Sequence, residues 1–224
     1  MRFTYSDLNL SFELKENETV VVIVENQSLF SKMVDELINQ CSGQEGGFVL
    51  ADDEKIKNIS KEVQLIMNPF AVDCNEKKIL QKLYQEIETV GLEDYIEDIN
   101  MLHSEVLSCL DKLSASVPYA VSYSIDLNLS AILKAYSFQI DTKANNLLES
   151  LTNYLRILNQ LCHINIFCFV NLKTFLSDVE MMQLYEFAFY QKIYLILLEN
   201  TQKNTLKGEK TCIVDTDQCI ININ

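Results

Sequence analysis

Clusters of lysine are the feature of this sequence that could bind a phosphate-bearing ligand. The chain of 224 residues holds 18 lysines and arginines against 32 acidic residues, which gives a net charge of −14. That balance argues against a nucleic-acid partner unless basic residues gather on one face. Ordinary solvated surface is the simplest interpretation of each cluster, and the alternative is that an oligomer turns one of them inward. The clusters are Lys55, Lys57 and Lys61, then Lys77, Lys78 and Lys82, and finally Lys203, Lys207 and Lys210.

The turn after the first buried strand is where an α/β fold would bind a nucleotide. A phosphate-binding loop needs glycines, so that backbone amides can wrap the phosphates, and a Lys followed by Ser or Thr. This turn reads Glu25-Asn26-Gln27-Ser28, the first glycine of the chain is Gly43, and Lys32 is followed by Met33. We therefore expect no working phosphate loop and no nucleotide hydrolysis.

Catalytic and metal-ligating patterns are weak. His103 lies in an amphipathic helical pattern and His163 at a helix end, and both are interpreted as structural histidines. Cys162 adjoins His163, but neighbours in sequence point apart on a helix and do not form a dyad. The acidic groups at 52–54, 93–98 and 215–217 are interpreted as solvated charges. The sequence thus predicts a protein that is not an enzyme and requires no cofactor.

Composition and cysteine usage predict a cytoplasmic globular protein. Apolar residues make up 48% of the chain, enough for a sizeable core. The seven cysteines are an odd number, and no two are closer than six residues, which argues against a disulfide framework and a Cys-x-x-Cys zinc site. The longest uncharged apolar-rich stretch, 157–172, is too short and too polar to span a bilayer, so no membrane partner is expected.

Three runs are apolar on both faces and predict the central strands of an α/β sheet. They cover 20–24, 166–170 and 193–198, and their lack of alternation is typical of parallel strands covered on both sides. Helical patterns lie between them. Ser28 is expected to cap the first helix, and Ser177 with Glu180 forms the pattern of a capping box before another helix.

The middle of the chain predicts an inserted helical leg. From about 75 to 117 the apolar residues recur every three or four positions, and Gly91 interrupts the run, which predicts two helices joined at a tight turn. Such an amphipathic hairpin has little core of its own, so we expect it to pack on a partner chain. The apolar stripe expected to do so consists of Tyr95, Ile99, Leu102, Val106 and Leu113.

Three stretches carry a resemblance to a known family. They are VVVIVENQSLFSKMVDEL at 20–37, DCNEKKILQKLYQEIE at 73–88, and the segment 145–200, whose two strands end in FVN and LLEN. In these residues, and in the lengths of the elements along nearly the whole chain, the sequence resembles the ring-forming spacer-acquisition accessory proteins of type II-A CRISPR systems.

The resemblance implies an α/β fold whose head is similar to P-loop NTPases but lacks a Walker motif, with an inserted α-helical leg hairpin. The corresponding boundaries are 1–73 for the first part of the head, 74–135 for the leg and 136–224 for the second part of the head. It also implies a homotetrameric ring whose lysine-lined hole takes the ends of double-stranded DNA without catalysis. Partners implied for the family are the two CRISPR adaptation integrase proteins and the effector nuclease.

Calcium is implied by the family but poorly supported by these residues. Family members carry an acidic stretch between leg and head that helps to hold calcium, and the equivalent stretch here, 117–126, keeps only Asp126. One carboxylate cannot supply the six to eight oxygens that calcium takes. Either backbone groups and distant carboxylates complete a site around Asp126, or the protein does without calcium, and we favour the second.

The leading hypothesis is therefore a non-enzymatic ring that binds double-stranded DNA without reading its sequence. Four chains at −14 each carry −56, yet lysines on an inner wall could still meet phosphates. The expected contacts are Lys55, Lys57, Lys61, Lys77, Lys78 and Lys82. One alternative is a degenerate or divergent P-loop-like NTPase, and another is an adaptor whose hairpin docks a partner helix.

Overall fold

The computed structural model describes residues 1–53 and 55–223 and divides into two compact units. Met1–Cys74 and Thr142–Asn224 form the unit that we call the head, and Asn75–Asp141 form the leg. The sequence prediction set these boundaries after 73 and after 135. Glu54, from the acidic group at 52–54, lies outside the described residues.

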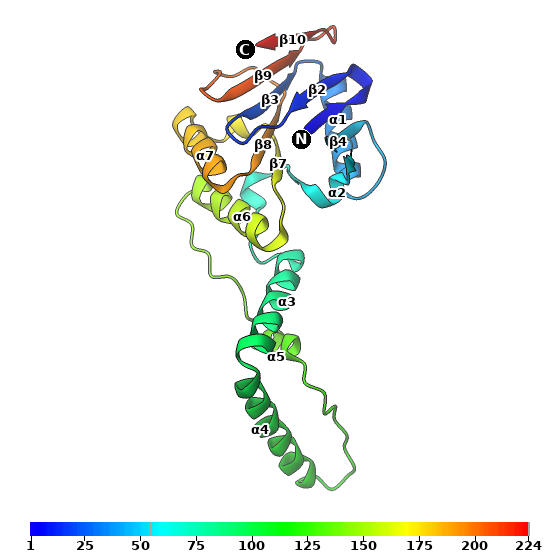
Figure 1. Ribbon diagram of the computed structural model, residues 1–224, viewed down its shortest axis with the longest axis vertical. Helices are drawn as coiled ribbons and strands as arrows, with labels where there is room; N and C mark the ends of the chain where they lie inside the picture. Colours follow the sequence, from blue (N-terminus) through cyan, green and yellow to red (C-terminus); the bar gives the residue numbers. More distant parts are fainter. Residues whose placement is uncertain (54, 224) are drawn as a thin grey trace. The chain divides into compact units, whose positions relative to one another are not determined.

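A six-stranded sheet forms the centre of the head, in the order β10-β9-β3-β8-β7-β6 (Figure 1). Its first five strands in chain order are mutually parallel, and β10 runs antiparallel to β9. The three predicted central strands are confirmed, and they lie side by side as β3, β8 and β7. The strands are β3 (Thr19–Val24), β6 (Val63–Ile66), β7 (Ile166–Val170), β8 (Tyr194–Glu199), β9 (Glu209–Val214) and β10 (Ile220–Ile223).

A smaller antiparallel sheet stands beside it, in the order β2-β1-β4-β5. Its strands are β1 (Arg2–Tyr5), β2 (Leu10–Glu13), β4 (Phe48–Asp52) and β5 (Lys55–Lys57). Alternate residues of the first three strands are buried, so this sheet turns one face to the core. Within this sheet the sequence predicts a short strand at 48–50, and β4 confirms it.

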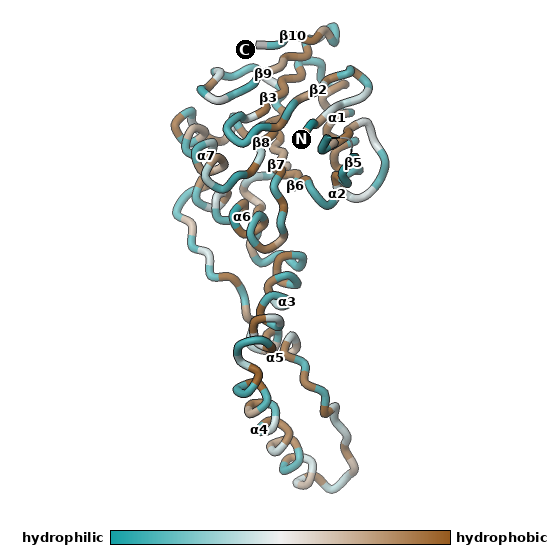
Figure 2. Tube along the Cα trace, viewed as in Figure 1, coloured by the Kyte–Doolittle hydropathy of each residue, from teal (hydrophilic) through white to brown (hydrophobic). Residues whose placement is uncertain are grey.

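The head helices cover both faces of the large sheet. Residues such as Val22 and Cys168 pack with α1 (Gln27–Cys41) and the small sheet in one core cluster. Alternation along a strand turns neighbours such as Val21 and Phe167 to the opposite face, where α6 (Leu147–Cys162) and α7 (Asp178–Gln191) lie (Figure 1). Figure 2 shows the apolar residues concentrated along β3, β7 and β8.

Short helical turns complete the head and connect its strands. The four-residue α2 (Ile59–Glu62) leads into β6, and three 3-10 turns lie at η1 (Ser6–Leu8), η2 (Pro69–Ala71) and η3 (Leu172–Thr174). No helix in the described part of the chain is long and apolar enough to cross a membrane.

Two helix starts separate a correct prediction from a wrong one. The capping box at α7 is confirmed: Ser177 accepts the Glu180 amide, and the Glu180 carboxylate accepts the Ser177 amide. At α1 the cap is Asn26 and not Ser28, because the Asn26 Oδ1 atom accepts the amide of Leu29 at 3.0 Å.

The leg consists of α3 (Lys77–Asp94), α4 (Ile96–Ala115) and the short α5 (Leu129–Ala135). The first two helices meet at Tyr95, whose φ of −128° leaves the helical region, and not at Gly91 as predicted. Gly91 lies inside α3 at a close contact, since a Cβ there would stand 2.9 Å from Ile99 Cδ1 and 3.1 Å from Leu129 Cδ2. Its missing side chain makes room for α4 and α5.

The two long leg helices do not pair along their length. Figure 1 shows α4 leading away from the end of α3, and the chain returning beside α4 through residues 116–128 without regular structure. Ile99 is the buried residue of α4, close to the junction. In place of the expected helical hairpin, the leg thus has two successive helices and a return segment.

Candidate functional site

The first lysine cluster lies at an edge of the small sheet in the head. Lys55 and Lys57 stand two residues apart on β5, so both project from the same face of this edge strand. Lys61 follows on α2 and is exposed, as is Lys55. None of the three forms an ion pair with another residue that the structure describes. Lysines on an edge strand also discourage unwanted strand pairing, so this cluster has a purely structural explanation.

The second cluster occupies the start of α3 in the leg. Lys77, Lys78 and Lys82 are all exposed, and they too make no ion pair within the described part of the chain. The amino end of a helix carries a partial positive charge, so each lysine in the first turn costs up to about 1 kcal/mol. Within α3 the acidic residues begin only at Glu86. Glu76, the N-cap residue of α3, directly precedes this cluster.

The structure assigns these clusters to different units and does not join them into one site. Lys55, Lys57 and Lys61 belong to the head, whereas Lys77, Lys78 and Lys82 belong to the leg. A shared role of the six lysines in one DNA interface stays a prediction.

The surroundings of Asp126 do not fit a calcium ion. Its carboxylate is exposed and accepts the Ser124 hydroxyl at 3.2 Å. No group of three His, Cys, Asp or Glu side chains with metal-binding spacing occurs among the described residues. The Asp215 carboxylate is used in the turn between β9 and β10, where it accepts the amides of Asp217 and Cys219. We therefore derive no role for a metal from these residues.

The turn where a nucleotide phosphate would bind is filled by side chains of the protein. Asn26 accepts the Leu29 amide and donates through Nδ2 to the Thr216 carbonyl at 2.9 Å. Lys32, the nearest lysine, forms a 2.6 Å ion pair with Asp7 and also approaches Glu36. The amide that would bind a phosphate and the lysine that would neutralise it thus have protein partners.

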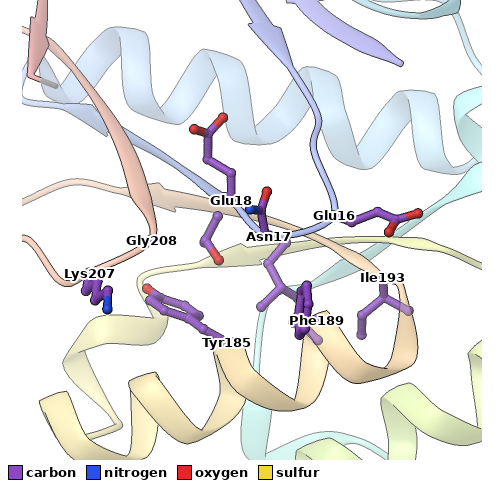
Figure 3. Close-up of a pocket in the computed structure, with 11 residues that line it drawn as sticks. Glu16, Asn17, Glu18, Tyr185, Phe189, Ile193, Lys207 and Gly208 are labelled. Atoms are coloured by element: carbon purple, nitrogen blue, oxygen red, sulfur yellow. The ribbon is translucent and has the colours of Figure 1, made fainter.

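A pocket in the head opens at the other end of the parallel strands, beside the starts of β3 and β9. Figure 3 shows Tyr185 and Phe189 of α7 beneath the loop that carries Glu16, Asn17 and Glu18. Lys207 is the lysine in its lining. Ligands of open α/β sheets bind at the carboxyl ends of the strands, and two carboxylates oppose an anionic ligand, so this pocket does not suit a nucleotide.

A buried polar network, which the sequence analysis missed, lies next to that pocket. Lys173 Nζ contacts Glu209 Oε1 at 2.7 Å, with 4% and 1% of the two side chains exposed, and donates to the Asn204 carbonyl at 2.6 Å. The Tyr185 hydroxyl donates to the same Glu209 oxygen at 2.6 Å, and the Leu206 amide to the other. Each charge is thus partnered, and the network ties the loop before β9 to η3 and α7.

Glu199 is a second buried carboxylate in the same part of the head. It ends the apolar strand β8 and accepts the Lys173 amide at 3.0 Å. Burial raises its pKa to about 7, although that amide, the Lys173 charge and other nearby donors act in the opposite direction. A carboxylate that closes a fully apolar run was the sequence signal for it.

Comparison with known proteins gives one family. The model for the CRISPR-associated protein family Cas_Csn2 matches residues 40–218 of this chain. The CRISPR-associated protein Csn2 of Streptococcus agalactiae is 19% identical over 218 residues, which cover 93% of this chain and 92% of that protein.

A solved structure of a metal-chelate type ABC transporter in an inward-facing conformation also aligns with the chain. It is 11% identical, covers all of this chain and 80% of its own, and reaches a TM-score of 0.43. An alignment with so low a TM-score supports no conclusion about the fold or the function of this chain.

Proposed function

Since the chain belongs to the Cas_Csn2 family of CRISPR-associated proteins, we propose that it is a non-enzymatic accessory protein of spacer acquisition. In this proposal it forms a homotetrameric ring that binds the ends of double-stranded DNA through the central hole, without reading the base sequence. It works there beside the adaptation integrase proteins and the effector nuclease.

The main observation in favour of DNA binding is the lysine cluster at the start of α3. Lys77, Lys78 and Lys82 are exposed and form no ion pair with described residues, and the first two lie in the first turn of α3, where the helix dipole disfavours positive charge. A phosphate backbone would offset that cost, because it brings further negative charge to the helix start and to the lysines beside the N-cap residue Glu76. Lys55, Lys57 and Lys61 on β5 and α2 are the second candidate contacts.

Self-association is supported by the exposed apolar stripe of α4. The predicted stripe remains largely uncovered in the single chain: Leu102 is 44% exposed, Val106 42% and Leu113 58%. Burying these side chains on a partner removes apolar surface from water at about 25 cal/mol per Å². A ring built from such contacts also explains how an acidic protein binds DNA, because lysines inside the hole are shielded from the acidic exterior.

Threading can be tested with a linear duplex and a relaxed covalently closed circle of the same sequence. A closed ring admits only a duplex with an end, so gel retardation should retain the linear DNA and bind the circle much less. Equal binding of both forms contradicts threading. If about six to ten phosphates are neutralised, the affinity should fall by roughly 10³–10⁵ between 50 and 200 mM salt.

Lysine variants test which cluster faces the DNA. Lys78→Ala removes one lysine from every subunit, so the slope of log affinity against log salt should become measurably flatter. Lys112→Ala, an exposed lysine near the end of α4, is the matched control and should leave the slope unchanged. Unchanged slopes for Lys78→Ala and for Lys57→Ala would exclude both clusters as contacts.

The oligomer is tested by placing a charge in the stripe. Leu102→Lys should convert the tetramer to monomers or insoluble protein, because a lysine buried in that seam costs several kcal/mol. Asn100→Lys makes the same charge change on another face of α4 and should keep the mass of the tetramer. A soluble Leu102→Lys protein of unchanged mass in light scattering contradicts the proposal.

The rival NTPase hypothesis predicts a ligand that the ring hypothesis does not. A nucleotide that binds only the folded state raises the melting temperature. We expect no shift with ATP and Mg²⁺ at millimolar concentration. Turnover that disappears in Lys32→Ala would overturn the non-enzymatic proposal.

A further inference from the structure

The return segment of the leg has the sequence pattern of a strand but no strand partner. Apolar residues occupy every second position at Tyr119, Val121, Tyr123 and Ile125, with Ala120, Ser122 and Ser124 between them. Strict alternation of this kind is typical of a half-buried β-strand. Within the described residues the segment forms neither a helix nor a strand.

Both the backbone and the side chains of this segment are available. The backbone groups of 120–125 make no backbone hydrogen bond to any other described residue. The four apolar side chains are 67%, 46%, 36% and 69% exposed in chain order. An extended segment with a free edge and an apolar face is a template for pairing with another strand.

We propose that residues 119–125 pair antiparallel with the same residues of a second copy of this chain, about a two-fold axis at Ser122. This inference rests on the proposed function in so far as that function requires self-association, and it identifies a segment that carries it. In this register Tyr119 faces Ile125 of the second copy, and Val121 faces its Tyr123. Each aromatic side chain thus meets a β-branched one, which is among the favourable cross-strand combinations.

The sequence of the segment favours a second copy of this chain as the partner strand. A two-fold contact must be self-complementary, and the order Tyr-Val-Tyr-Ile read antiparallel against itself satisfies this without placing like charges opposite each other. Pro118 falls just outside the paired residues, so its missing amide costs no ladder hydrogen bond. Asp126 would stand opposite that proline at each end.

The apolar face of the resulting ribbon also has a surface to cover. An isolated two-stranded ribbon is marginal in water and needs packing on its apolar face. The segment returns beside α4, and the Tyr123 hydroxyl donates to the Asp111 carboxylate on that helix. Leu102, Val106 and Leu113 of α4 are exposed apolar residues of the same leg that such a ribbon could cover.

Cysteine cross-linking tests the register directly. Ser122→Cys would face its own copy across the axis, within the 4.4–6.8 Å Cα separation of a disulfide. Ala120→Cys would lie opposite Ser124, four residues or about 13 Å from its own copy. The variants are made in a Cys109→Ser/Cys219→Ser background, which removes the exposed native thiols.

Under mild oxidation, Ser122→Cys should form covalent dimers roughly ten-fold or more faster than Ala120→Cys, because pairing raises the local thiol concentration. An equal mixture of Ala120→Cys and Ser124→Cys should cross-link where each alone does not. Equal rates for Ser122→Cys and Ala120→Cys overturn the pairing.

Light scattering on the same samples distinguishes a failure of the strand pairing from a failure of the proposed ring. A tetramer without the Ser122→Cys cross-link leaves the proposed ring standing and excludes this strand pair. A monomer at all concentrations that also fails to cross-link contradicts both. Because Ser122 is exposed in the single chain, its substitution leaves the fold of the leg intact, and circular dichroism checks this.

Discussion

The head and the leg differ in how far they bury their apolar side chains. In the head, the central strands and α6 bury Phe167, Phe169, Leu151, Leu155 and Leu158 completely. In the leg, α4 buries Ile99 near its junction with α3 and leaves its remaining apolar residues at least partly in contact with water. The head therefore supplies its own core, whereas α4 of the leg leaves most of its apolar side chains exposed in the single chain.

The largest effect that separates the two units is expected from core truncation. Phe169→Ala should lower the free energy of unfolding by about 3–5 kcal/mol, since it removes a ring that is 0% exposed and leaves a cavity. Leu113→Ala on the leg, where the side chain is 58% exposed, should change the free energy of unfolding by less than about 0.5 kcal/mol. Urea denaturation at low protein concentration measures both, and comparable losses would remove the contrast.

The next largest effect on stability is expected from the buried ion pair between Lys173 and Glu209. Lys173→Met should cost about 3 kcal/mol, because it leaves the Glu209 carboxylate buried without its cation. Lys173→Met combined with Glu209→Gln should recover part of that loss in the same denaturation experiment. Lys32→Met, which removes an exposed ion pair of α1, is the control and should leave the urea midpoint unchanged. A midpoint as low for Lys32→Met as for Lys173→Met would contradict this assignment.

Glu199 predicts a pH dependence that belongs to the head. Its pKa of about 7 lies above the ordinary value of 4.5, so the folded chain holds the proton more tightly than the unfolded chain. Stability should therefore fall as the pH rises from about 5 to 7 and level off above. Glu199→Gln, neutral at every pH, should be about 1–3 kcal/mol more stable than the native chain at pH 8 and equal to it at pH 4.

Thermal unfolding across this pH range provides the measurement for Glu199. Glu86→Gln, an exposed position on the leg, should reproduce the native profile. A Glu199→Gln profile that also parallels the native one would show that this carboxyl does not set the pH dependence.

The smallest expected effect comes from helix caps. Ser177→Ala removes the capping box of α7 and should lower the stability of the head by about 1 kcal/mol. Asn128→Ala removes the cap of α5, where Asn128 Oδ1 accepts the Ala131 amide at 2.8 Å, and should raise amide exchange only within the leg. Exchange that spreads into β7 or β8 in Asn128→Ala would mean that the two units unfold together.

The sequence correctly predicted the elements that depend on residues close together in the chain. The runs 20–24, 166–170 and 193–198 are apolar throughout because both faces of a parallel sheet are covered, and that composition identifies them without any partner. The capping box at Ser177 and the glycine-free turn at 25–28 are equally local. The lysine clusters were found in the sequence, but their division between the head and the leg follows only from the fold.

Tertiary structure decided what depends on residues far apart in the chain. Asn26 caps α1 instead of Ser28 and also reaches the Thr216 carbonyl, a contact across 190 positions. The leg breaks at Tyr95, while Gly91 lies inside α3 at the point where Ile99 and Leu129 approach that helix. The network of Lys173, Tyr185 and Glu209 joins η3, α7 and β9, whose charges look like ordinary surface charges in the sequence. Local patterns report the environment of neighbouring residues, whereas these contacts exist only after the sheet has brought distant segments together.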